Sequence, residues 1–511
     1  MAKVYCAYVD LENKTTEIFH DGEITTINGC RVCDVINMST NTICFVPSVK
    51  VMMKIYPGGE WDGSEYYKNN DSDILSYKYG KCEFRSFGSL ICMQTPSTLC
   101  DIYQGSPVSV AMYKYLCDID SPEKIKYPLA YYAKKKFYGD IADELWRERS
   151  QKKKYYWDEQ TYWDMMASVK GGALSDYRAK YVEDVLLYDI RSAYASVLVN
   201  DDKFPVGKIV KIDCSNKEYC FVKIKKFLRS GTWFKIVFDG RCDAFARWYD
   251  KRADKTGIEY YNYKTIDMIC QTEKLFDYLR TVPFRLYYTK ETGYVNKLVR
   301  DKIVDLYNQK ESQDHGTFDR YITKTQIEMI YGKGIQHYDF EDIFDIQDHY
   351  RGRGDNYLTP EMSNHCLAKV EYEIYRATAN TTSEYFDTDG IKVRNEQRAI
   401  DYFNSENEKI MKSNKDAGYD TNIGTWKFEG NAQRMLIFTP KIYIYEINGE
   451  IEFKAAGVTK EYRKRILNAI KGDKITYLRK HGFKTATKKY IYSCGNFEIR
   501  YDMGDLKGDL Q

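Results

Sequence analysis

The chain has 511 residues and a net charge of +3, with 43% hydrophobic and 30% charged residues. This length exceeds one compact domain and predicts roughly three structural units. The composition is that of a soluble globular protein, and the small net charge excludes a polycation. Residues 1–10 resemble no signal peptide and no apolar run is long enough to span a membrane, so we expect no membrane partner.

Fourteen cysteines, eight of them within the first 117 residues, are spread mostly singly along the chain. Without a secretory signal they are better interpreted as reduced core residues than as a disulfide framework. Cys30 and Cys33 form one CxxC pair, but a zinc site needs a second pair and no convincing one follows. Two buried thiols are therefore the simpler interpretation of this pair.

Lysine and arginine are interleaved with aromatic residues in three runs, at 132–140, 149–163 and 477–492. Cations bind phosphates and ring faces stack on bases or sugars, so this pairing favours nucleic acid as a partner. A solvated surface is the alternative for any single run, because the chain contains 48 tyrosines.

The first half of the chain is rich in strand patterns. Short strand-like runs punctuated by Gly, Asn and Asp fill residues 1–120, and a charged, aromatic and helical stretch follows at about 130–165. A Gly-Gly turn, an apolar strand near 184–190 and a short helix come next. Residues 201–290 combine strand and loop patterns with short helices.

Three helices are predicted in the second half, at 294–311, 318–334 and 358–380. The first carries a continuous apolar stripe, and the second ends at glycine. A polar insertion at 334–357 separates the second helix from the third. A hairpin at 381–395 follows the third helix.

The hairpin carries two acids, Asp387 and Asp389, one residue apart. They form either a solvated turn or half of a site for a hard cation such as Mg²⁺, which prefers carboxylate oxygens. Asp189, at the end of the apolar strand, offers the missing half, although an acid in that place usually caps the next helix. If the two segments are neighbours, they complete a two-metal site with ions about 3.5–4 Å apart.

One face of the helix at 318–334 has an unusual composition. Arg320, Lys324, Ile327 and Tyr331 follow one another at helical spacing on this face. Two cations and an aromatic ring suit a clamp for a triphosphate and a base or sugar. A solvated face is the alternative interpretation.

Five segments, in order, resemble motifs of family B DNA polymerases. They correspond to the Gly-Gly turn between exonuclease and polymerase, the first polymerase motif, the fingers motif, the third motif and the Lys-x-Tyr motif, and they lie at 168–173, 189–197, 324–333, 386–391 and 440–445. The spacings are similar to those of the protein-primed branch. Two further segments, 423–430 and 452–460, also resemble that branch, so the resemblance covers residues 165 to about 470.

The resemblance implies roles for the matching residues. Asp189 and Asp389 would be the main metal ligands, with Asp387 beside them and the carbonyl oxygen of Ile190 as a further ligand. Tyr194 would lie under the sugar and exclude a 2′-hydroxyl. The residues implied to hold the incoming nucleotide on the fingers are Lys324, Arg320 in support, and Tyr331. The residues implied to contact DNA are Lys170, Gly171, Gly172, Lys441 and Tyr443, the last two at the primer terminus.

Three motifs depart from the family pattern. Glu328 and Met329 replace Asn-Ser in the fingers motif, and Gly390 replaces the Ser that follows the third motif's acids. Ala193 and Ala195 replace the Leu and Pro of the first motif. No metal ligand is lost, so we expect effects on fidelity or nucleotide grip.

The implied fold is an α+β right-hand polymerase with palm, fingers and thumb. Its expected divisions are an RNase-H-like, exonuclease-like domain at 1–130, a connector and first palm segment at 131–200, an insertion resembling the primer- and partner-handling insertion at 201–290, fingers at 291–333, a short second insertion at 334–357, palm at 358–467 and thumb at 468–511.

The implied function is DNA-directed DNA synthesis in the replication of a phage or mobile-element genome, within the host cytoplasm. A primer 3′-hydroxyl attacks the α-phosphate of a dNTP, assisted by two Mg²⁺ ions, for which Mn²⁺ substitutes. The expected partners are a DNA primer-template, dNTPs and, in the protein-primed branch, a priming protein. The sequence does not distinguish a protein, RNA or DNA primer.

Two alternatives remain open. One is a primase or RNA-making polymerase on the same palm, against which the bulky Tyr194 argues. The other is an inactive palm that binds nucleic acid, against which the three acids argue.

The N-terminal region only partly matches an exonuclease. Asp10 and Glu12 resemble its first motif, whereas Tyr115 and Asp118 are one residue short of the spacing in its third motif. A two-metal site does not tolerate a missing ligand. We therefore predict a degenerate exonuclease domain with little 3′-to-5′ activity.

Overall fold

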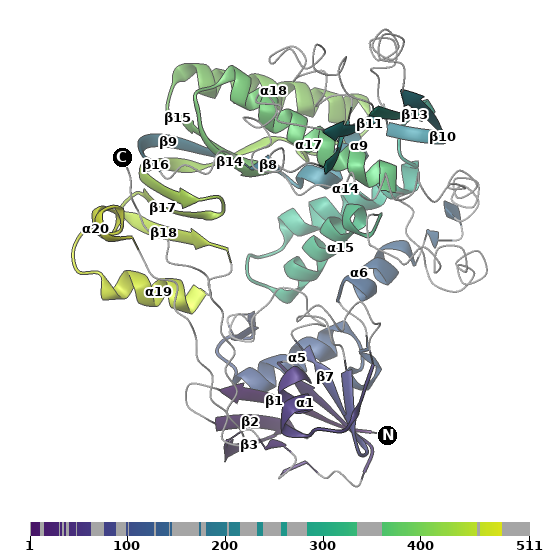
Figure 1. Cartoon of the computed structure of the whole chain (residues 1–511), viewed down its shortest axis with the longest axis vertical. Coiled ribbons are helices and arrows are strands. Elements are labelled where there is room, and N and C mark those ends of the chain that lie inside the picture. The colour runs from purple at the N-terminus through teal and green to yellow at the C-terminus, as the bar shows by residue number, and fades with distance from the viewer. Residues whose placement is uncertain are drawn as a thin grey trace. The chain divides into compact units, whose positions relative to one another are not determined.

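The computed structural model (Figure 1) describes the following residues, with short gaps: 2–145, except mainly 63–75 and 88–98, then 173–174, 180–214, 232–238, 257–262, 284–334, 360–456 and 460–482. The predicted second insertion, the CxxC pair, the basic run at 149–163 and the Gly-Gly turn lie outside the described residues. No helix in the described ranges is long and apolar enough to cross a bilayer.

The chain forms two compact units, where its length predicted roughly three. One unit contains Met1–Phe137 and Gln309–Gln326, and the other contains Tyr138–Asn308 and Ile327–Thr485. Fewer units form because segments that are distant in sequence share one sheet, as described below for the second unit.

The first unit is built on a mixed sheet with the strand order β3-β2-β1-β4-β7-β6-β5. Neighbours β1 and β2, and β2 and β3, are antiparallel, whereas β4 pairs in parallel with β1 and β7. Asp21 and Gly22 both have positive φ and close the tight turn between β2 and β3. The strands are β1 (Lys3–Asp10), β2 (Thr15–His20), β3 (Glu23–Asn28), β4 (Thr42–Val46), β5 (Glu60–Asp62), β6 (Ser76–Tyr79) and β7 (Cys82–Ser86).

Alternating side chains of this sheet enter two cores. Tyr5 and Cys44 pack on one face with α1 (Val49–Ile55). Cys6 and Phe45 pack on the other face with α5 (Val108–Ile119). The described buried cysteines carry free thiols, which agrees with the prediction of reduced core residues. Two short helices follow: η2 (Pro122–Lys124) and α6 (Leu129–Tyr138).

The second unit is built on an antiparallel sheet with the order β18-β17-β16-β9-β15-β14-β8. The 11-residue β9 lies at its centre and pairs with β15 on one side and β16 on the other. The strands are β8 (Ala173–Leu174), β9 (Lys180–Ile190), β14 (Ser383–Thr388), β15 (Gly390–Arg394), β16 (Trp426–Thr439), β17 (Ile442–Ile447) and β18 (Glu450–Ala455).

Helices cover one face of this sheet near β9. The ring of Tyr188 stacks on Phe403 of α18 (Gln397–Asp416) at 3.9 Å, and Phe386 meets Tyr375 of α17 (Pro360–Asn380). The short helix α9 (Ala193–Asn200) packs against α17 and α18 (Figure 1). Since side chains alternate along a strand, Asp189 projects from the face opposite to Tyr188.

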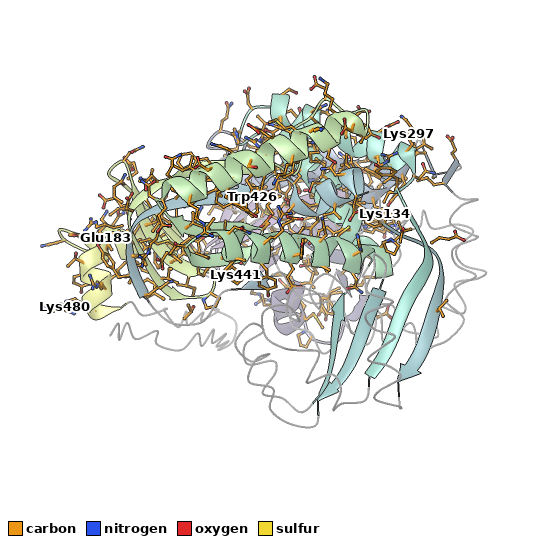
Figure 2. All side chains as sticks on the ribbon, turned by 90° about the horizontal axis from the view of Figure 1, so that it is seen from above. Lys134, Glu183, Lys297, Trp426, Lys441 and Lys480 are labelled. Carbon is orange, nitrogen blue, oxygen red and sulfur yellow. The ribbon has the colours of Figure 1, made fainter. Side chains whose placement is uncertain are left out.

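A second antiparallel sheet of this unit occupies the predicted insertion at 201–290, with the order β10-β13-β11-β12. Its four strands lie side by side (Figure 2). They are β10 (Phe204–Cys214), β11 (Thr232–Phe238), β12 (Gly257–Asn262) and β13 (Phe284–Gly293).

The three helices predicted in the second half are present, and α14 (Lys297–Ser312) and α15 (Phe318–Gly334) precede α17. After β18 come α19 (Lys460–Ala469) and α20 (Lys474–His481). Asp473 caps α20 by accepting hydrogen bonds from the N–H groups of Ile475 and Thr476.

Candidate active site

The strand register brings the predicted acids together. Asp189, at the end of β9, lies directly opposite Gly390 of β15, and Gly390 in turn lies opposite Asp387 of β14. The Ile190 N–H donates to the carbonyl oxygen of Asp389 at 3.0 Å, which fixes the hairpin turn against the end of β9. Thr388 adopts a φ of 62°, so the chain reverses tightly between the two acids. The predicted neighbourhood of the two segments is therefore confirmed.

Asp189 and Asp389 form an electrostatically strained pair. Burial, repulsion by Asp389 and then repulsion by Glu429 raise the pKa of Asp189 to about 7. Burial is also the main cause that raises the pKa of Asp389, to which Asp387 and Glu328 contribute. Two buried carboxylates that repel each other create a demand for positive charge.

Asp387 has a different environment. It accepts hydrogen bonds from the hydroxyls of Thr388 at 2.9 Å and Tyr385 at 3.3 Å. The Lys441 ammonium lies 3.8 Å from its Oδ1. Protein groups thus satisfy Asp387, whereas the charge of Asp189 and Asp389 is less compensated.

This donor set fits Mg²⁺. Among the described residues, no three acidic, His or Cys side chains converge into a preformed metal cage. Mg²⁺ needs no such cage, because it binds through one or two carboxylates, waters and substrate phosphates. The hard oxygens of Asp189 and Asp389 and their unmet charge match that requirement.

Two tyrosines predicted to hold the nucleotide meet beside the acids. The rings of Tyr194, on α9, and Tyr331, on α15, stack at a centroid distance of 4.2 Å. Burial and the neighbouring Glu328 and Asp389 raise the pKa of Tyr331 to about 12, so its hydroxyl stays neutral. The pair provides a flat aromatic wall near Asp389.

The Lys-x-Tyr motif also reaches this site. The Lys441 N–H donates to the Tyr385 hydroxyl at 2.8 Å, and the Tyr443 ring lies 5.3 Å from that of Tyr385. Lys441 has a φ of 65°, an unusual conformation for a side-chain-bearing residue. Figure 2 shows the Lys441 side chain among those of this unit.

The two fingers cations belong to the first unit, so their geometry relative to the acids is not described. The Arg320 guanidinium donates to the carbonyl oxygens of Lys310 and Gln313, which places it at the end of α14. Lys324 is exposed on α15, and Ile327 of the same predicted face is buried. Their nucleotide-binding roles stay predictions.

The remaining predicted residues are only partly described. Lys170, Gly171, Gly172 and Glu12 lie outside the described residues. Asp10 ends β1, opposite Thr15. Asp118, on the last turn of α5, accepts a hydrogen bond from Tyr103 at 2.6 Å.

Asp10 and Asp118 are not brought together. The first turn of α5 is fixed by Ser109, which donates to Glu17, a residue paired with Tyr8. Farther along α5, Tyr113 packs on Phe19, which pairs with Cys6. The helix therefore runs away from the Asp10 end of β1, and Asp118 lies near the C-terminal end of α5, far from Asp10.

Sequence reasoning did not identify Lys392 as a site residue. It lies on β15 opposite Leu187 and Tyr385, so it projects from the same sheet face as Asp189 and Asp387. Its residue exposure is only 7%. Alternation along β15 puts Lys392 on the same face as Gly390, but the pairing of β15 with β9 is what brings it to Asp189.

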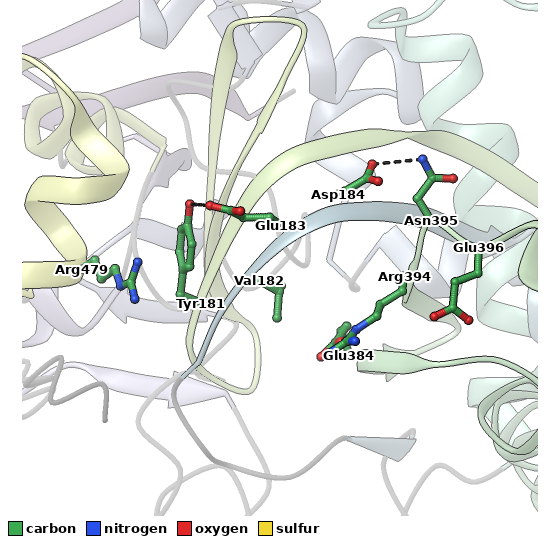
Figure 3. Close-up of a pocket in the computed structure, with 9 residues that line it drawn as sticks. All are labelled: Tyr181, Val182, Glu183, Asp184, Glu384, Arg394, Asn395, Glu396 and Arg479. Atoms are coloured by element: carbon green, nitrogen blue, oxygen red, sulfur yellow. Dashed lines mark hydrogen bonds and ion pairs between the residues drawn. The ribbon is translucent and has the colours of Figure 1, made fainter.

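A separate pocket lies at the opposite end of β9 (Figure 3). Its volume is about 520 Å³, and residues of β9, the ends of β14 and β15, and α20 line it. Asp184 on its wall accepts amide hydrogen bonds from Asn395 and Asn431. Asp184 and Asp189 are five positions apart on β9, about 17 Å along a strand, so this pocket is distinct from the carboxylate site.

Comparison with known proteins gives structural matches only. No protein-family model and no curated protein sequence matches the chain. Phi29 DNA polymerase complexed with primer-template DNA is similar, with a TM-score of 0.61 and 12% identity over 91% of this chain and 94% of that chain. Its orthorhombic crystal form and its complex with single-stranded DNA give TM-scores of 0.59 and 0.58, with the same identity and coverage.

The chain has the fold of phi29 DNA polymerase. The predicted α+β right-hand architecture is therefore confirmed, although 12% identity assigns neither the branch nor the reaction. Within this fold, the order β9-β15-β14 places Asp189 and the hairpin that carries Asp387 and Asp389 next to each other.

Proposed function

We propose that the chain is a DNA-directed DNA polymerase that adds dNMP to a primer 3′-hydroxyl under the direction of a template. The observation that carries this proposal is the proximity of Asp189, at the end of β9, to Asp389, in the turn between β14 and β15, within a polymerase fold. The stacked Tyr194 and Tyr331 beside them supply a surface for the sugar and base.

Asp189 and Asp389 would hold two Mg²⁺ ions, with the Ile190 carbonyl as a further ligand and Mn²⁺ as a substitute. When bound, such ions lower the pKa of the primer 3′-hydroxyl and neutralise charge on the departing pyrophosphate. Tyr194 would close the space that a ribose 2′-hydroxyl needs. Lys441 and Tyr443 would position the primer terminus, and Lys324 with Arg320 would bind the triphosphate.

The biological setting follows from the motif resemblance. The protein-primed branch replicates phage and mobile-element genomes in a host cytoplasm, so a priming protein is the partner to test. Primer-template DNA and incoming nucleotides are bound by phi29 DNA polymerase in its solved complexes. The bulk of Tyr194 favours DNA synthesis over the alternative of an RNA-making enzyme.

The deciding experiment is primer extension with Mg²⁺ by Asp189→Asn and Asp389→Asn. We expect each variant to lose nucleotide addition by at least about 10³-fold, because neutralisation of developing charge supplies several kcal/mol of the barrier. Asp416→Asn, an exposed acid on α18, is the control and should extend primers normally. Near wild-type extension by either site variant would show that these acids do not carry the reaction.

A further inference from the structure

A buried lysine lies among the acids of the site. Lys392 is 7% exposed, and its ammonium lies 5.8 and 5.6 Å from the ring centroids of Tyr385 and Tyr443. Such distances permit cation–π attraction to both rings. This ammonium therefore lies against two aromatic rings, one of which is the tyrosine of the Lys-x-Tyr motif.

The absence of a side chain at Gly390 makes room for this ammonium. A Cβ built on Gly390 would lie 3.0 Å from Lys392 Nζ and 3.0 Å from Asp189 Oδ1. Both polar atoms thus border the space that any other residue would fill. They can be no farther apart than twice that distance, so Lys392 is within electrostatic reach of the principal acid.

Charge gives the ammonium a role. Burial lowers the pKa of Lys392, while Asp189, Asp387, Glu429 and Asp389 act in the opposite direction. Burial is the main cause that raises the pKa of Asp189 and Asp389, and the Lys392 ammonium opposes that rise without cancelling it. A charge that is nearly removed from water requires an opposite charge nearby. Here the Lys392 ammonium and the carboxylates of Asp189 and Asp389 partly compensate one another.

We propose that Lys392 is a resident cation of the carboxylate set, a positioning residue that holds Asp189 and Asp389 in place before divalent ions bind and that weakens the binding of those ions. A fixed positive charge partly satisfies the acids and repels an incoming dication. The chain thereby requires a higher divalent-ion concentration to load its site. This inference rests on the proposed function, because it takes the two acids as the metal ligands.

The test measures the affinity of the full chain for Mn²⁺ without DNA or nucleotide. The electron paramagnetic resonance signal of free Mn²⁺ reports how much of the ion remains unbound. Lys392→Met keeps the length of the side chain and removes its charge. We expect it to bind Mn²⁺ about tenfold more tightly at the site that Asp189→Asn abolishes, because the variant removes the Coulomb repulsion between the ammonium and the dication over several ångströms at intermediate dielectric. Lys412→Met, an exposed change of equal charge on α18, should leave the affinity unchanged.

A second variant separates charge from packing. Gly390→Ser inserts a Cβ 3.0 Å from both polar atoms, so we expect it to perturb Mn²⁺ affinity and lower the melting temperature in EDTA. Adding Lys392→Met should restore much of that melting temperature, since it removes the buried charge that the new side chain displaces. Such non-additivity is expected only for residues in contact.

The outcomes are distinct. Unchanged or weaker Mn²⁺ binding by folded Lys392→Met, with normal binding by the wild type, would overturn the role of Lys392 and leave the polymerase proposal standing. If Lys392→Met does not fold, Lys392→Gln replaces it in the comparison with Gly390→Ser. The role of Lys392 would be overturned equally if the two single changes in melting temperature added up to the change in the double variant. Wild-type protein without any Mn²⁺ site that depends on Asp189 would overturn both proposals.

Discussion

Tyr194 is the residue whose position bears most directly on sugar choice. It stacks on Tyr331 and is partly buried beside Asp389. Tyr194→Val removes the ring, so we expect ribonucleotide incorporation relative to deoxyribonucleotide incorporation to rise by about tenfold or more, equivalent to about 1.4 kcal/mol. Single-nucleotide extension with each nucleotide set measures the ratio. An unchanged ratio would remove Tyr194 from this role.

The acids also predict a pH dependence of stability without metal. Burial and Asp389 raise the pKa of Asp189 from 3.8 to about 7, so the folded chain binds more protons than the unfolded chain between these values. Folding stability due to this group therefore falls as pH rises from about 4 to 7. Asp189→Asn lacks that loss, and its stability relative to wild type should rise over this window, by up to about 1.4 kcal/mol per pKa unit.

Urea unfolding in EDTA at several pH values measures this difference. The matched control is Asp416→Asn on α18, whose exposed carboxyl should give a flat difference. A constant difference for Asp189→Asn across the window would show that this acid is not held in a strained, buried pair.

At the residue scale, the sequence predicted the acids and their aromatic neighbours because these lie in contiguous motifs. It did not predict Lys392, because the role of that residue depends on which strands flank β15. The lysine faces Asp189 only through pairing of β15 with β9, and it faces Tyr443 through the fold of β16 and β17. Such contacts arise from register across the sheet, which a local pattern does not specify.

Among the elements, the turn between β9 and α9 depends on a neighbouring loop. The Gly424 N–H donates to the Arg191 carbonyl, and the Arg191 N–H donates to the Thr425 carbonyl. Gly424 has a φ of 85°, and a Cβ there would lie 2.9 Å from the Ser196 Cβ. The loop therefore fixes the chain directly after Asp189 and Ile190.

Gly424→Ala should destabilise this turn through both backbone strain and overpacking. Gly418→Ala is the matched control, because Gly418 has a φ of 90° and open space around its Cβ. We expect Gly424→Ala to cost about 1–3 kcal/mol more than the control in the free energy of unfolding by urea. Equal losses in the two variants would show that the contact with Ser196 contributes nothing.

Element types were predictable where periodicity was strong, as for α14 and α17. Boundaries were less so: the strand expected near 184–190 begins at Lys180, because Tyr181 and Val182 extend the pairing with β16. Likewise, the sequence placed Arg320, Ile327 and Tyr331 on one face of α15 without showing their contacts. In the structure Ile327 is buried, and the Arg320 guanidinium donates to carbonyl oxygens at the end of α14. Tertiary packing decides both details.

At the scale of the whole molecule, the N-terminal unit keeps its sheet and two cores, whereas the chemistry expected of an exonuclease is incomplete in the described part. Asp118, on the last turn of α5, accepts a hydrogen bond from the Tyr103 hydroxyl. This turn lies away from the Asp10 end of β1. We expect little trimming of a mismatched 3′ end on single-stranded DNA with Mg²⁺ and no dNTPs, since a two-metal site fails without a ligand.

The control for this experiment is the Asp10→Ala, Glu12→Ala double variant. Its rate of trimming, read by gel electrophoresis of end-labelled DNA, should equal the low wild-type rate. Steady wild-type trimming that disappears in the double variant would show that the domain is catalytically active.

The number of units was the feature least accessible from sequence. β9 and the strands from β14 onward form one sheet although more than 180 residues separate Ile190 from Ser383. Counting residues treats such segments as separate domains. The ordered motifs nevertheless indicated the polymerase architecture, because the first, third and Lys-x-Tyr motifs lie on strands of this one sheet or directly beside them.

The space shared by Gly390 and Lys392 also constrains how this sequence can change over generations. A serine at position 390 would place its Cβ 3.0 Å from the ends of the Lys392 and Asp189 side chains, so we expect it to be accommodated more easily after position 392 has lost its long charged side chain. The effect of a substitution at position 390 thus depends on the residue at position 392, so the order in which the two substitutions occur affects the stability of the intermediate sequence. Among diverging descendants of this chain, these positions should vary together rather than independently.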